Sequence, residues 1–258
     1  MKFTILTLFP EITDAYFASS IMAKALEKGI IRYEAVNIRD FTLDSHKTCD
    51  DAPYGGGPGM LMMAEPLSRA LESVGVTKKT AKFPNEAPHV IYLTPSGRLF
   101  NQKRALELAR MEELVLICGR YEGIDQRIID AFVDEELSVG DYVLSSGETA
   151  ALVLVDSVYR LVDKVITSES LAEESFSGGL LEYPQYTRPE IFDTMKVPEV
   201  LLSGHHENIR KWRLKKRVEK TLATRGDLVE EGLKEGLFDA ETERLIEEGK
   251  SNERNQGN

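Results

Sequence analysis

The sequence predicts an α/β domain with a mostly parallel sheet, followed by a small all-helical domain. Up to about residue 164, short apolar runs alternate with segments of helical periodicity, which is the order of elements in a parallel sheet. After Pro189 the apolar spacing is helical. Residues 165–188 mix acids, serine and glycine without a clear period. We therefore expect domains at 1–164 and 189–258, joined by an interdomain linker.

The elements of the first domain follow from local patterns. A β-rich apolar run closed by Pro10 predicts a buried strand over 2–8. A helical pattern begins at Pro10 and ends at Lys28, before Gly29, because proline suits the first turn of a helix and glycine the position after the last. Further strands are expected at 30–38, 89–93 and 113–118, and further helices at 64–74, 101–111, 123–132 and 147–162.

The composition is that of an ordinary globular protein. Of 258 residues, 42% are hydrophobic and 29% are charged, which suffices for one large core and a small second domain. No apolar stretch approaches the roughly 20 residues of a membrane span. Cys49 and Cys118 stand in unrelated contexts, and His205 and His206 lack partners at metal-ligand spacing. We expect a soluble cytoplasmic protein with no metal site of its own.

The charge is distributed unevenly. A net charge of −11 argues against general attraction to nucleic acid. Residues 227–258 hold ten acidic side chains against four basic ones, whereas residues 205–217 hold six basic ones against one glutamate. Trp212 stands among these cations and would either stack on a base or enter a small helical core. The overall negative charge therefore does not exclude RNA binding by the basic segment.

Glycine-bearing loops are candidate binding sites. Residues 39–60 are expected to be a loop, and their PYGGGPGM segment (53–60) lets backbone amides approach an anion or a base closely. It lacks the ending of a P-loop, and no G-x-G-x-x-G occurs. Each loop could instead be a plain turn. Three further loops, at 92–97, 119–125 and 138–148, are expected to follow strands of the sheet. Together these three loops could surround a nucleotide-sized ligand at one edge of the sheet.

Several longer motifs, in this order, resemble the bacterial tRNA (guanine-N1)-methyltransferase family of the SPOUT class. The resemblance extends from Leu8 to about Leu222. The matching segments are RDFT (39–42), DDAPYGGGPGMLMM (50–63), YLTPSG (92–97), CGRYEGID (118–125), SVGDYVLSSGE (138–148), DSVYR (156–160), EESFSGGLLEYPQYTRPE (173–190) and SGHHENIRKWRLK (203–215).

The resemblance implies a deep trefoil knot in the first domain, a homodimer, and S-adenosylmethionine as methyl donor. Composition and periodicity would not suggest a knot, because knotted chains are rare. The resemblance also allows for Mg²⁺ as a further cofactor. The implied donor-binding residues are Tyr92, Leu93, Thr94, Gly119, Tyr121, Glu122, Ser138, Val139, Gly140, Asp141, Tyr142, Val143, Leu144 and Gly147.

The implied reaction is methylation of N1 of guanosine 37 in a tRNA that has guanosine at position 36. The family's catalytic carboxylate matches Glu174, and its arginine matches Arg160. Guanine N1 carries a proton, which Glu174 would accept as general base, while Arg160 would stabilise charge developing toward O6. On residue type alone, Glu174 would be a solvated acid of a loop, and Arg160 a surface cation complementing a helix dipole.

The resemblance assigns tRNA contacts to two regions. Asp50 and the glycine loop are implied to hold the target base and its neighbour, and the basic segment is implied to grip the tRNA. The residues concerned are Asp50, Pro53, Gly55, Gly59, His205, Arg210, Lys211, Trp212 and Lys215.

The sequence departs from the family pattern at three positions. Many relatives have aspartate where this chain has Glu174, glycine where it has Ser146, and proline where it has Ala150. The alternatives are another SPOUT RNA methyltransferase, a non-catalytic RNA-binding protein, and a metabolic nucleotide-binding enzyme. The YGGGPG and QYTRP segments disfavour the first. The donor-type loops disfavour the second, and the basic helical segment disfavours the third.

Overall fold

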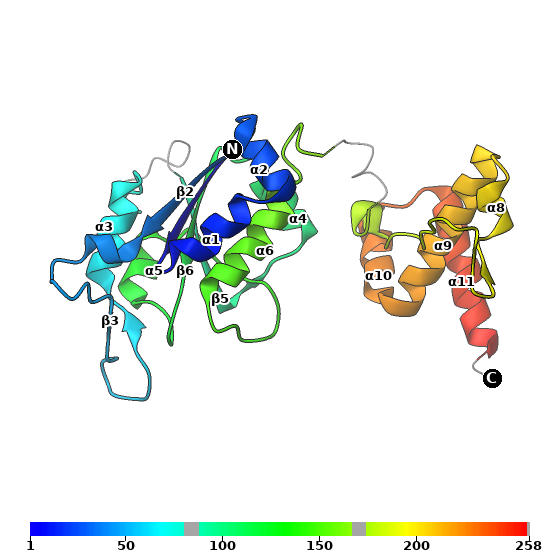
Figure 1. Ribbon diagram of the computed structural model, residues 1–258. Coiled ribbons are helices and arrows are strands. Elements are labelled where there is room, and N and C mark those ends of the chain that lie inside the picture. Colours follow the sequence, from blue (N-terminus) through cyan, green and yellow to red (C-terminus); the bar gives the residue numbers. More distant parts are fainter. Residues whose placement is uncertain (80–87, 167–173, 257–258) are drawn as a thin grey trace. The chain divides into compact units, whose positions relative to one another are not determined.

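The computed structural model describes residues 1–79, 88–166 and 174–256, with backbone only for 252–256. The chain divides into two compact units, residues 1–166 and 167–258, and each is considered by itself. The first unit has alternating strands and helices, and the described part of the second unit is built mostly of helices (Figure 1). Within the described residues, no helix is both long enough and apolar enough to cross a bilayer.

A five-stranded parallel sheet forms the centre of the first unit within the described residues. Its strand order is β2-β1-β6-β5-β7, and every neighbouring pair is parallel. The expected α/β class with a mostly parallel sheet is confirmed. The strands are β1 (Lys2–Thr7), β2 (Arg32–Asn37), β5 (His89–Leu99), β6 (Glu113–Cys118) and β7 (Glu135–Ser138).

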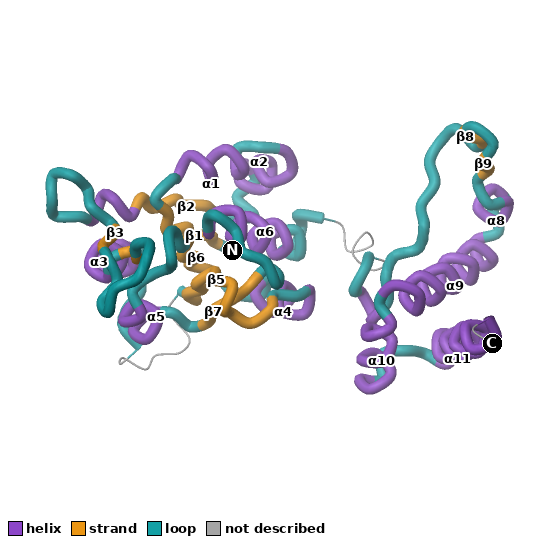
Figure 2. The backbone as a smooth tube through the Cα atoms, turned by 90° about the horizontal axis from the view of Figure 1, so that it is seen from below, coloured by secondary structure: helices purple, strands orange, loops and turns teal. Residues whose placement is uncertain are grey.

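Helices cover both faces of this sheet (Figures 1 and 2). Side chains alternate along a strand, so Phe3 and Ile5 of β1 enter one core while Leu6 enters the other. The first core is covered by α1 (Pro10–Phe17), α2 (Ser20–Glu27), α4 (Gln102–Leu108) and α6 (Gly147–Tyr159). The second is covered by α3 (Ala64–Ser73) and α5 (Gln126–Phe132).

The single helix expected over 10–28 is wrong, because the chain breaks it into α1 and α2. Ser19 is extended, with φ −119° and ψ 151°. Phe17 and Met22 are both buried in the same core, although residues five apart lie about 140° apart around a continuous helix. The break lets both helices present their apolar side chains to the sheet.

The expected end of the strand at residue 93 is also wrong. Strand β5 continues to Leu99 through an irregularity in which Leu93 and Arg98 both pair with Leu137 of β7. Gly97 lies so close to β7 that a Cβ there would stand 2.6 Å from the carbonyl carbon of Glu136. The chain between Leu93 and Arg98 therefore bulges out of the pairing between β5 and β7.

The expected loop over 39–60 contains short regular elements. A 3₁₀ turn (Ile38–Phe41) follows β2, and β3 (Asp50–Asp51) pairs antiparallel with β4 (Leu61–Met62). Because β3 and β4 pair, the glycine loop between them forms the tip of a hairpin. The hydrogen bond from the Met63 amide to the Cys49 carbonyl, at 2.7 Å, extends this pairing.

The second unit is not entirely helical, which corrects the expectation for residues 189–258. A hairpin of β8 (Ile191–Phe192) and β9 (Met195–Lys196) precedes the helices. Two residues connect its strands, and Asp193 has a φ of 57°, which Asp tolerates better than most residues. The helices are α8 (Glu199–Leu202), α9 (His206–Thr224), α10 (Gly226–Glu235) and α11 (Ala240–Gln256).

The segment from Glu174 to Glu182 packs against α9. Leu180 is buried with Val218 and Val229 in a small core of this unit. The amide of Leu181 donates to Thr221 Oγ1 at 2.9 Å, and Arg217 donates to the Leu181 carbonyl at 3.2 Å. The described end of the expected linker is therefore a structural part of the second unit.

Candidate active site

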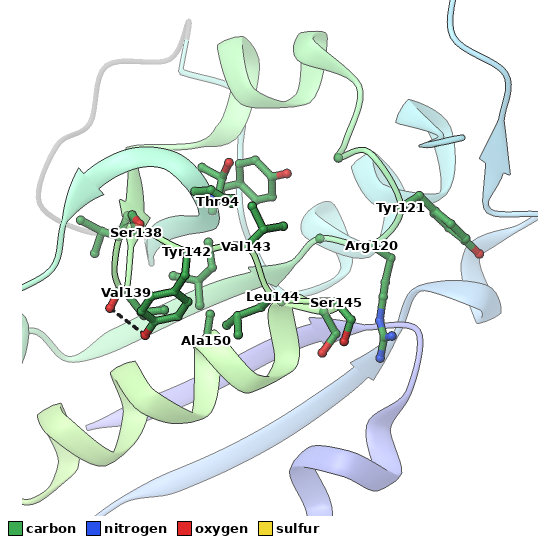
Figure 3. Close-up of a pocket in the computed structure, with 18 of the residues that line it drawn as sticks. Thr94, Arg120, Tyr121, Ser138, Val139, Tyr142, Val143, Leu144, Ser145 and Ala150 are labelled. Carbon is green, nitrogen blue, oxygen red and sulfur yellow. Dashed lines mark hydrogen bonds between the residues drawn. The ribbon is translucent and has the colours of Figure 1, made fainter. Parts of the chain in front are cut away.

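Three loops at the carboxyl edge of the sheet line one pocket (Figure 3). They follow β5, β6 and β7, whose ends meet at one edge because the strands are parallel. Most residues expected to bind the donor line this pocket. They are Tyr92, Leu93, Thr94, Gly119, Tyr121, Glu122, Ser138, Val139, Tyr142, Val143, Leu144 and Gly147.

Gly140 and Asp141, also expected at the donor, are not among the lining residues. Gly140 has a φ of 157°, and a Cβ there would overlap the Tyr142 ring. The Tyr142 hydroxyl donates to the Val139 carbonyl at 3.1 Å, as Figure 3 shows. Gly140 thus serves the pocket by letting the Tyr142 ring fold back over the loop.

Tyr92 forms part of the pocket floor. Its side chain is buried, and burial raises the pKa of its hydroxyl. A Cβ on Gly119 would stand 3.0 Å from this hydroxyl oxygen, and one on Gly123 would stand 3.3 Å from it. Glycine at these positions lets the 119–123 loop pass directly over the tyrosine.

The second and third pocket loops touch at a glycine pair. The Gly147 amide donates to the Gly119 carbonyl at 2.9 Å. A Cβ on Gly147 would stand 2.5 Å from the Gly119 nitrogen and 2.7 Å from the Cys118 Cα. Only glycine permits so close a backbone approach, so this contact sets the width of the pocket at its base.

The glycine loop is connected to the second pocket loop. The Met62 amide donates to the Gly123 carbonyl at 2.9 Å, and the Glu122 amide donates to the Met60 carbonyl at 3.1 Å. A Cβ on Gly59 would overlap the Glu122 side chain. The position of the glycine loop is therefore tied to that of the pocket.

Asp50 lies beside the same connection. Its carboxylate accepts a hydrogen bond of 3.1 Å from the Tyr121 hydroxyl. Partial burial, followed by this hydrogen bond and the negative charge of Asp50, raises the pKa of Tyr121. Pro53 and Gly55 lie farther along the loop, where the side chain of Tyr54 is fully exposed. The Asp50 end of the loop thus faces the pocket side, and its tip is free to contact a partner.

Arg160 and Glu174 belong to different units. Arg160 follows the last residue of α6 in the first unit. Glu174 begins the described part of the second unit, is partly buried, and accepts at its carbonyl from the Ser177 amide at 3.1 Å. Their shared role in one reaction stays a prediction.

The cations of α9 are largely paired with acids. Arg210 donates to Glu207 at 3.0 Å and to Glu241 at 2.8 Å. Lys211 stands 3.5 Å from Glu207, and Lys215 stands 3.9 Å from Glu219, as exposed pairs of the kind that contributes little to stability. His205 precedes the helix and is exposed. Most of these acids belong to α9 itself, and Glu241 of α11 is added by the fold.

Trp212 fits neither interpretation completely. It is partly buried, yet it does not belong to the core of the second unit. Its ring lies 6.4 Å from that of Tyr186, tilted by 53°. The neighbouring Arg213 guanidinium lies over the Tyr183 ring at 4.7 Å. Tyrosines from the preceding segment therefore cover the N-terminal half of α9.

Comparisons with known proteins agree on one family. The sequence matches the tRNA (Guanine-1)-methyltransferase TrmD family over residues 1–231. The chain belongs to this family. The tRNA (guanine-N(1)-)-methyltransferase of Treponema denticola is 62% identical over 248 residues, covering 96% of this chain and 98% of the relative. That of Borreliella burgdorferi is 60% identical over 230 residues, covering 88% and 92%, and that of Treponema pallidum is 56% identical over 248 residues, covering 96% of each.

Membership of the tRNA (Guanine-1)-methyltransferase family confirms the predicted enzyme class. The chain is a tRNA methyltransferase that modifies N1 of guanine. Among the described residues, no three His, Cys, Asp or Glu side chains are gathered in a way that could hold a metal ion. The pocket itself presents the carboxylate of Glu122, the guanidinium of Arg120 and several hydroxyl side chains.

Several pocket residues of this methyltransferase were not predicted. Arg120 and Gly123 belong to the CGRYEGID motif (118–125), several of whose residues were predicted to bind the donor. Their position in that motif could have predicted them as well. Ser146 and Ala150, the two departures from the family pattern that were expected to touch the donor pocket, do line this one. The lining residues that were not predicted are Pro95, Arg120, Gly123, Leu137 and Ser145.

Proposed function

We propose that the pocket binds S-adenosylmethionine, and that the methyl group goes to guanosine 37 of a tRNA with guanosine at position 36. The convergence of the loops after β5, β6 and β7 on one pocket carries this proposal. Membership of a methyltransferase family implies this donor. Position 37 rests on the resemblance of the YGGGPG and QYTRP segments.

The lining residues fit an adenosyl group. Leu93, Leu144 and Ala150 offer apolar surface for a flat heterocycle. The glycines at 119 and 147 add no side chain to the lining, so a ligand can approach the main chain of these loops closely. Glu122 adds a carboxylate for a ligand amine. We therefore assign the donor to this pocket.

The reaction needs a base for the N1 proton. S-adenosylmethionine supplies a methyl group attached to a positively charged sulfur. Glu174 accepts the proton of guanine N1, so that the N1 electron pair forms the new bond to the methyl carbon. The carbon–sulfur bond breaks at the same time, and its electron pair stays on sulfur, which leaves as neutral S-adenosylhomocysteine. Arg160 stabilises the negative charge that moves toward O6 as the proton leaves. The proposal requires the segment around Glu174 to reach a donor-bearing pocket when tRNA is present.

Two further architectural features belong to the proposal. A deep trefoil knot agrees with the close passage of Gly147 across Gly119, where one pocket loop crosses the other. A homodimer agrees with large apolar side chains exposed on α1 and α6, among them Ile12 and Val153. Burying such side chains in a partner would be favourable.

The remaining parts of the proposal concern tRNA and the cell. Asp50 with the glycine loop holds the target guanosine and its neighbour, and α9 holds the tRNA backbone through exposed cations such as Lys211 and Lys215. The small all-helical domain expected for this role would then be the second unit, with its added hairpin. A cytoplasmic location follows from a tRNA substrate, and Mg²⁺ would act alongside the tRNA.

A methyl-transfer assay tests the whole proposal. The full chain is incubated with methyl-labelled S-adenosylmethionine and two tRNA transcripts that differ only at position 37, guanosine in one and adenosine in the other. Label should enter the first transcript alone, as N1-methylguanosine after digestion. A third transcript, with adenosine at position 36, should be a poor substrate. Label in both of the first two transcripts, or in neither, would refute the proposal.

A further inference from the structure

We propose that a buried ion pair between Glu148 and Arg120 positions the two crossing pocket loops, and that Glu148 thereby sets the affinity for the methyl donor. Glu148 is not a lining residue of the pocket, so it acts as a positioning residue. The statement on affinity rests on the proposed donor site.

Glu148 is a fully buried carboxylate in the first turn of α6. Its Oε1 accepts a hydrogen bond of 2.6 Å from Thr7 Oγ1 at the end of β1. Its Oε2 lies 3.0 Å from Nε of Arg120. A buried carboxylate is tolerated only when charge and hydrogen bonds compensate for lost water, and the helix N-terminus adds to this compensation. Glu148 therefore depends on two segments distant in sequence.

Arg120 is held by the same cluster from the loop side. Its side chain extends toward the N-terminal strand, while Tyr121 next to it points elsewhere (Figure 3). The guanidinium lies 4.4 Å from the centre of the Phe9 ring. The Phe9 amide in turn donates to Thr7 Oγ1 at 2.9 Å. The chain just after β1 thus forms a fixed support beneath the loop.

The ion pair lies directly beside the glycine contact of the two loops. Arg120 follows Gly119, and Glu148 follows Gly147, so the charged pair continues the 2.9 Å backbone hydrogen bond between the glycines. The hydrogen bond joins the loops at one residue each, and the ion pair adds a second point. Two points of attachment restrict rotation of one loop against the other, which one point does not.

Loss of the pair should therefore lower the fraction of molecules with a preformed pocket. A ligand that binds only the preformed state binds more weakly in proportion to that fraction. The step that follows donor binding should change little, because neither Thr7 nor Glu148 lines the pocket, and Arg120, which does, keeps its charge and its contact with the Phe9 ring. The expected signature is a raised KM for S-adenosylmethionine at nearly constant kcat.

Glu148→Gln tests this in the full chain. Its amide group keeps the volume but carries no charge, so the ion pair with Arg120 is lost whichever way the amide is turned. We expect about tenfold weaker S-adenosylmethionine binding by calorimetry and about a tenfold higher KM for it, with kcat and the KM for tRNA changed by less than about twofold. Thr7→Val removes the hydrogen bond to Glu148 and the one from the Phe9 amide but keeps the charge pair, and it should give a smaller shift of the same kind.

The control is Leu71→Ala, in the core on the other side of the sheet. It should lower the melting temperature without raising the KM for the donor. If Glu148→Gln raised that KM no more than Leu71→Ala does, the inference would be overturned.

A measurement without donor separates this inference from the proposed cofactor. Amide hydrogen exchange at residues 119–123 and 145–147 should be about tenfold faster in Glu148→Gln than in the wild-type chain and in Leu71→Ala. Unchanged exchange would overturn the ion pair's role. A wild-type chain that failed to bind S-adenosylmethionine would instead refute the donor site, while the exchange rates would still decide whether the pair holds the loops.

Discussion

Gly119 and Gly147 show what single residues decide in this protein. Neither has a positive φ, so their glycine character is not a matter of backbone conformation. The requirement is space, since a Cβ on Gly147 would stand 2.5 Å from the Gly119 nitrogen. Backbone cannot move aside as a flexible side chain can. A pocket lined by main chain therefore depends on the smallest residue at its crossing point.

Gly147→Ala should destabilise the first unit. The new methyl group must displace backbone of β6 or of the following loop, and overpacking of this kind costs about 1–3 kcal/mol. Urea unfolding measures the loss. Gly226→Ala is the matched control, because a Cβ there meets nothing within 4 Å, and its stability should be unchanged or slightly higher. Equal stability of Gly147→Ala and the wild type would contradict the packing described.

Glu174→Gln should slow methyl transfer at least about 100-fold in a single turnover at saturating tRNA and donor. The amide keeps the size of the side chain but cannot accept the N1 proton. Glu182→Gln changes another acid of the same segment and should react at the wild-type rate. Filter binding of tRNA should be equal for both variants. A near wild-type rate for Glu174→Gln would remove it as the base.

At the scale of elements, β5, β7 and α4 are joined by a charged cluster whose members do not line the pocket. Glu135 of β7 accepts from His89 of β5 at 2.8 Å and from Nε of Arg104 of α4 at 3.1 Å. Burial disfavours the charged form of Glu135, but hydrogen bonds from His89 and Arg104 outweigh it and lower the pKa of this carboxyl. These contacts fix the edge strand whose loop lines the pocket.

This cluster predicts an acid dependence of stability. Because the folded pKa of Glu135 lies below its ordinary value of 4.5, its contribution is present above that value and is lost as the pH falls through the folded pKa. Urea unfolding between about pH 6 and pH 3 should show a shallower loss of stability in Glu135→Gln than in the wild type. Glu11→Gln, at an exposed position of α1, should follow the wild-type curve. Parallel curves for all three chains would contradict the assignment.

At the scale of the molecule, the two units divide the proposed work. The first unit holds the pocket, and the second holds Glu174 and the cations of α9. Some of these cations stabilise the fold of the second unit. Arg217, for example, donates hydrogen bonds to the carbonyls of Ser177 and Leu181. Others, such as Lys215, stand mostly in solvent. Substitutions along α9 should therefore separate folding from tRNA binding.

Lys215→Ala should weaken tRNA binding and lower the slope of log affinity against log salt concentration by about one, as expected when one phosphate contact is lost. Lys234→Ala, an exposed lysine of α10, makes the same change of net charge elsewhere. Its slope should equal that of the wild type. Titrations at several salt concentrations measure both, and an unchanged slope for Lys215→Ala would exclude this face of α9 from the tRNA interface.

Local patterns predicted which segments form strands and helices but missed where these elements break or continue. The apolar runs at 2–8 and 113–118 became β1 and β6, because such runs are stable only inside a covered sheet. The break at Ser19 and the continuation of β5 past Pro95 were not predictable. Both depend on packing against other elements, since Phe17 and Met22 share a core and Gly97 approaches β7.

The candidate site divides in the same way. The sequence by itself determined that polar, glycine-bearing loops follow the strands of one parallel sheet, and parallel strands necessarily bring such loops to one edge. Only the tertiary structure decided that Gly147 crosses Gly119, that Glu148 meets Arg120, and that Arg210 of α9 meets Glu241 of α11. These contacts join residues far apart along the chain, and no local preference encodes them. Their energies depend on burial and on the partner's position, which exist only in the folded molecule.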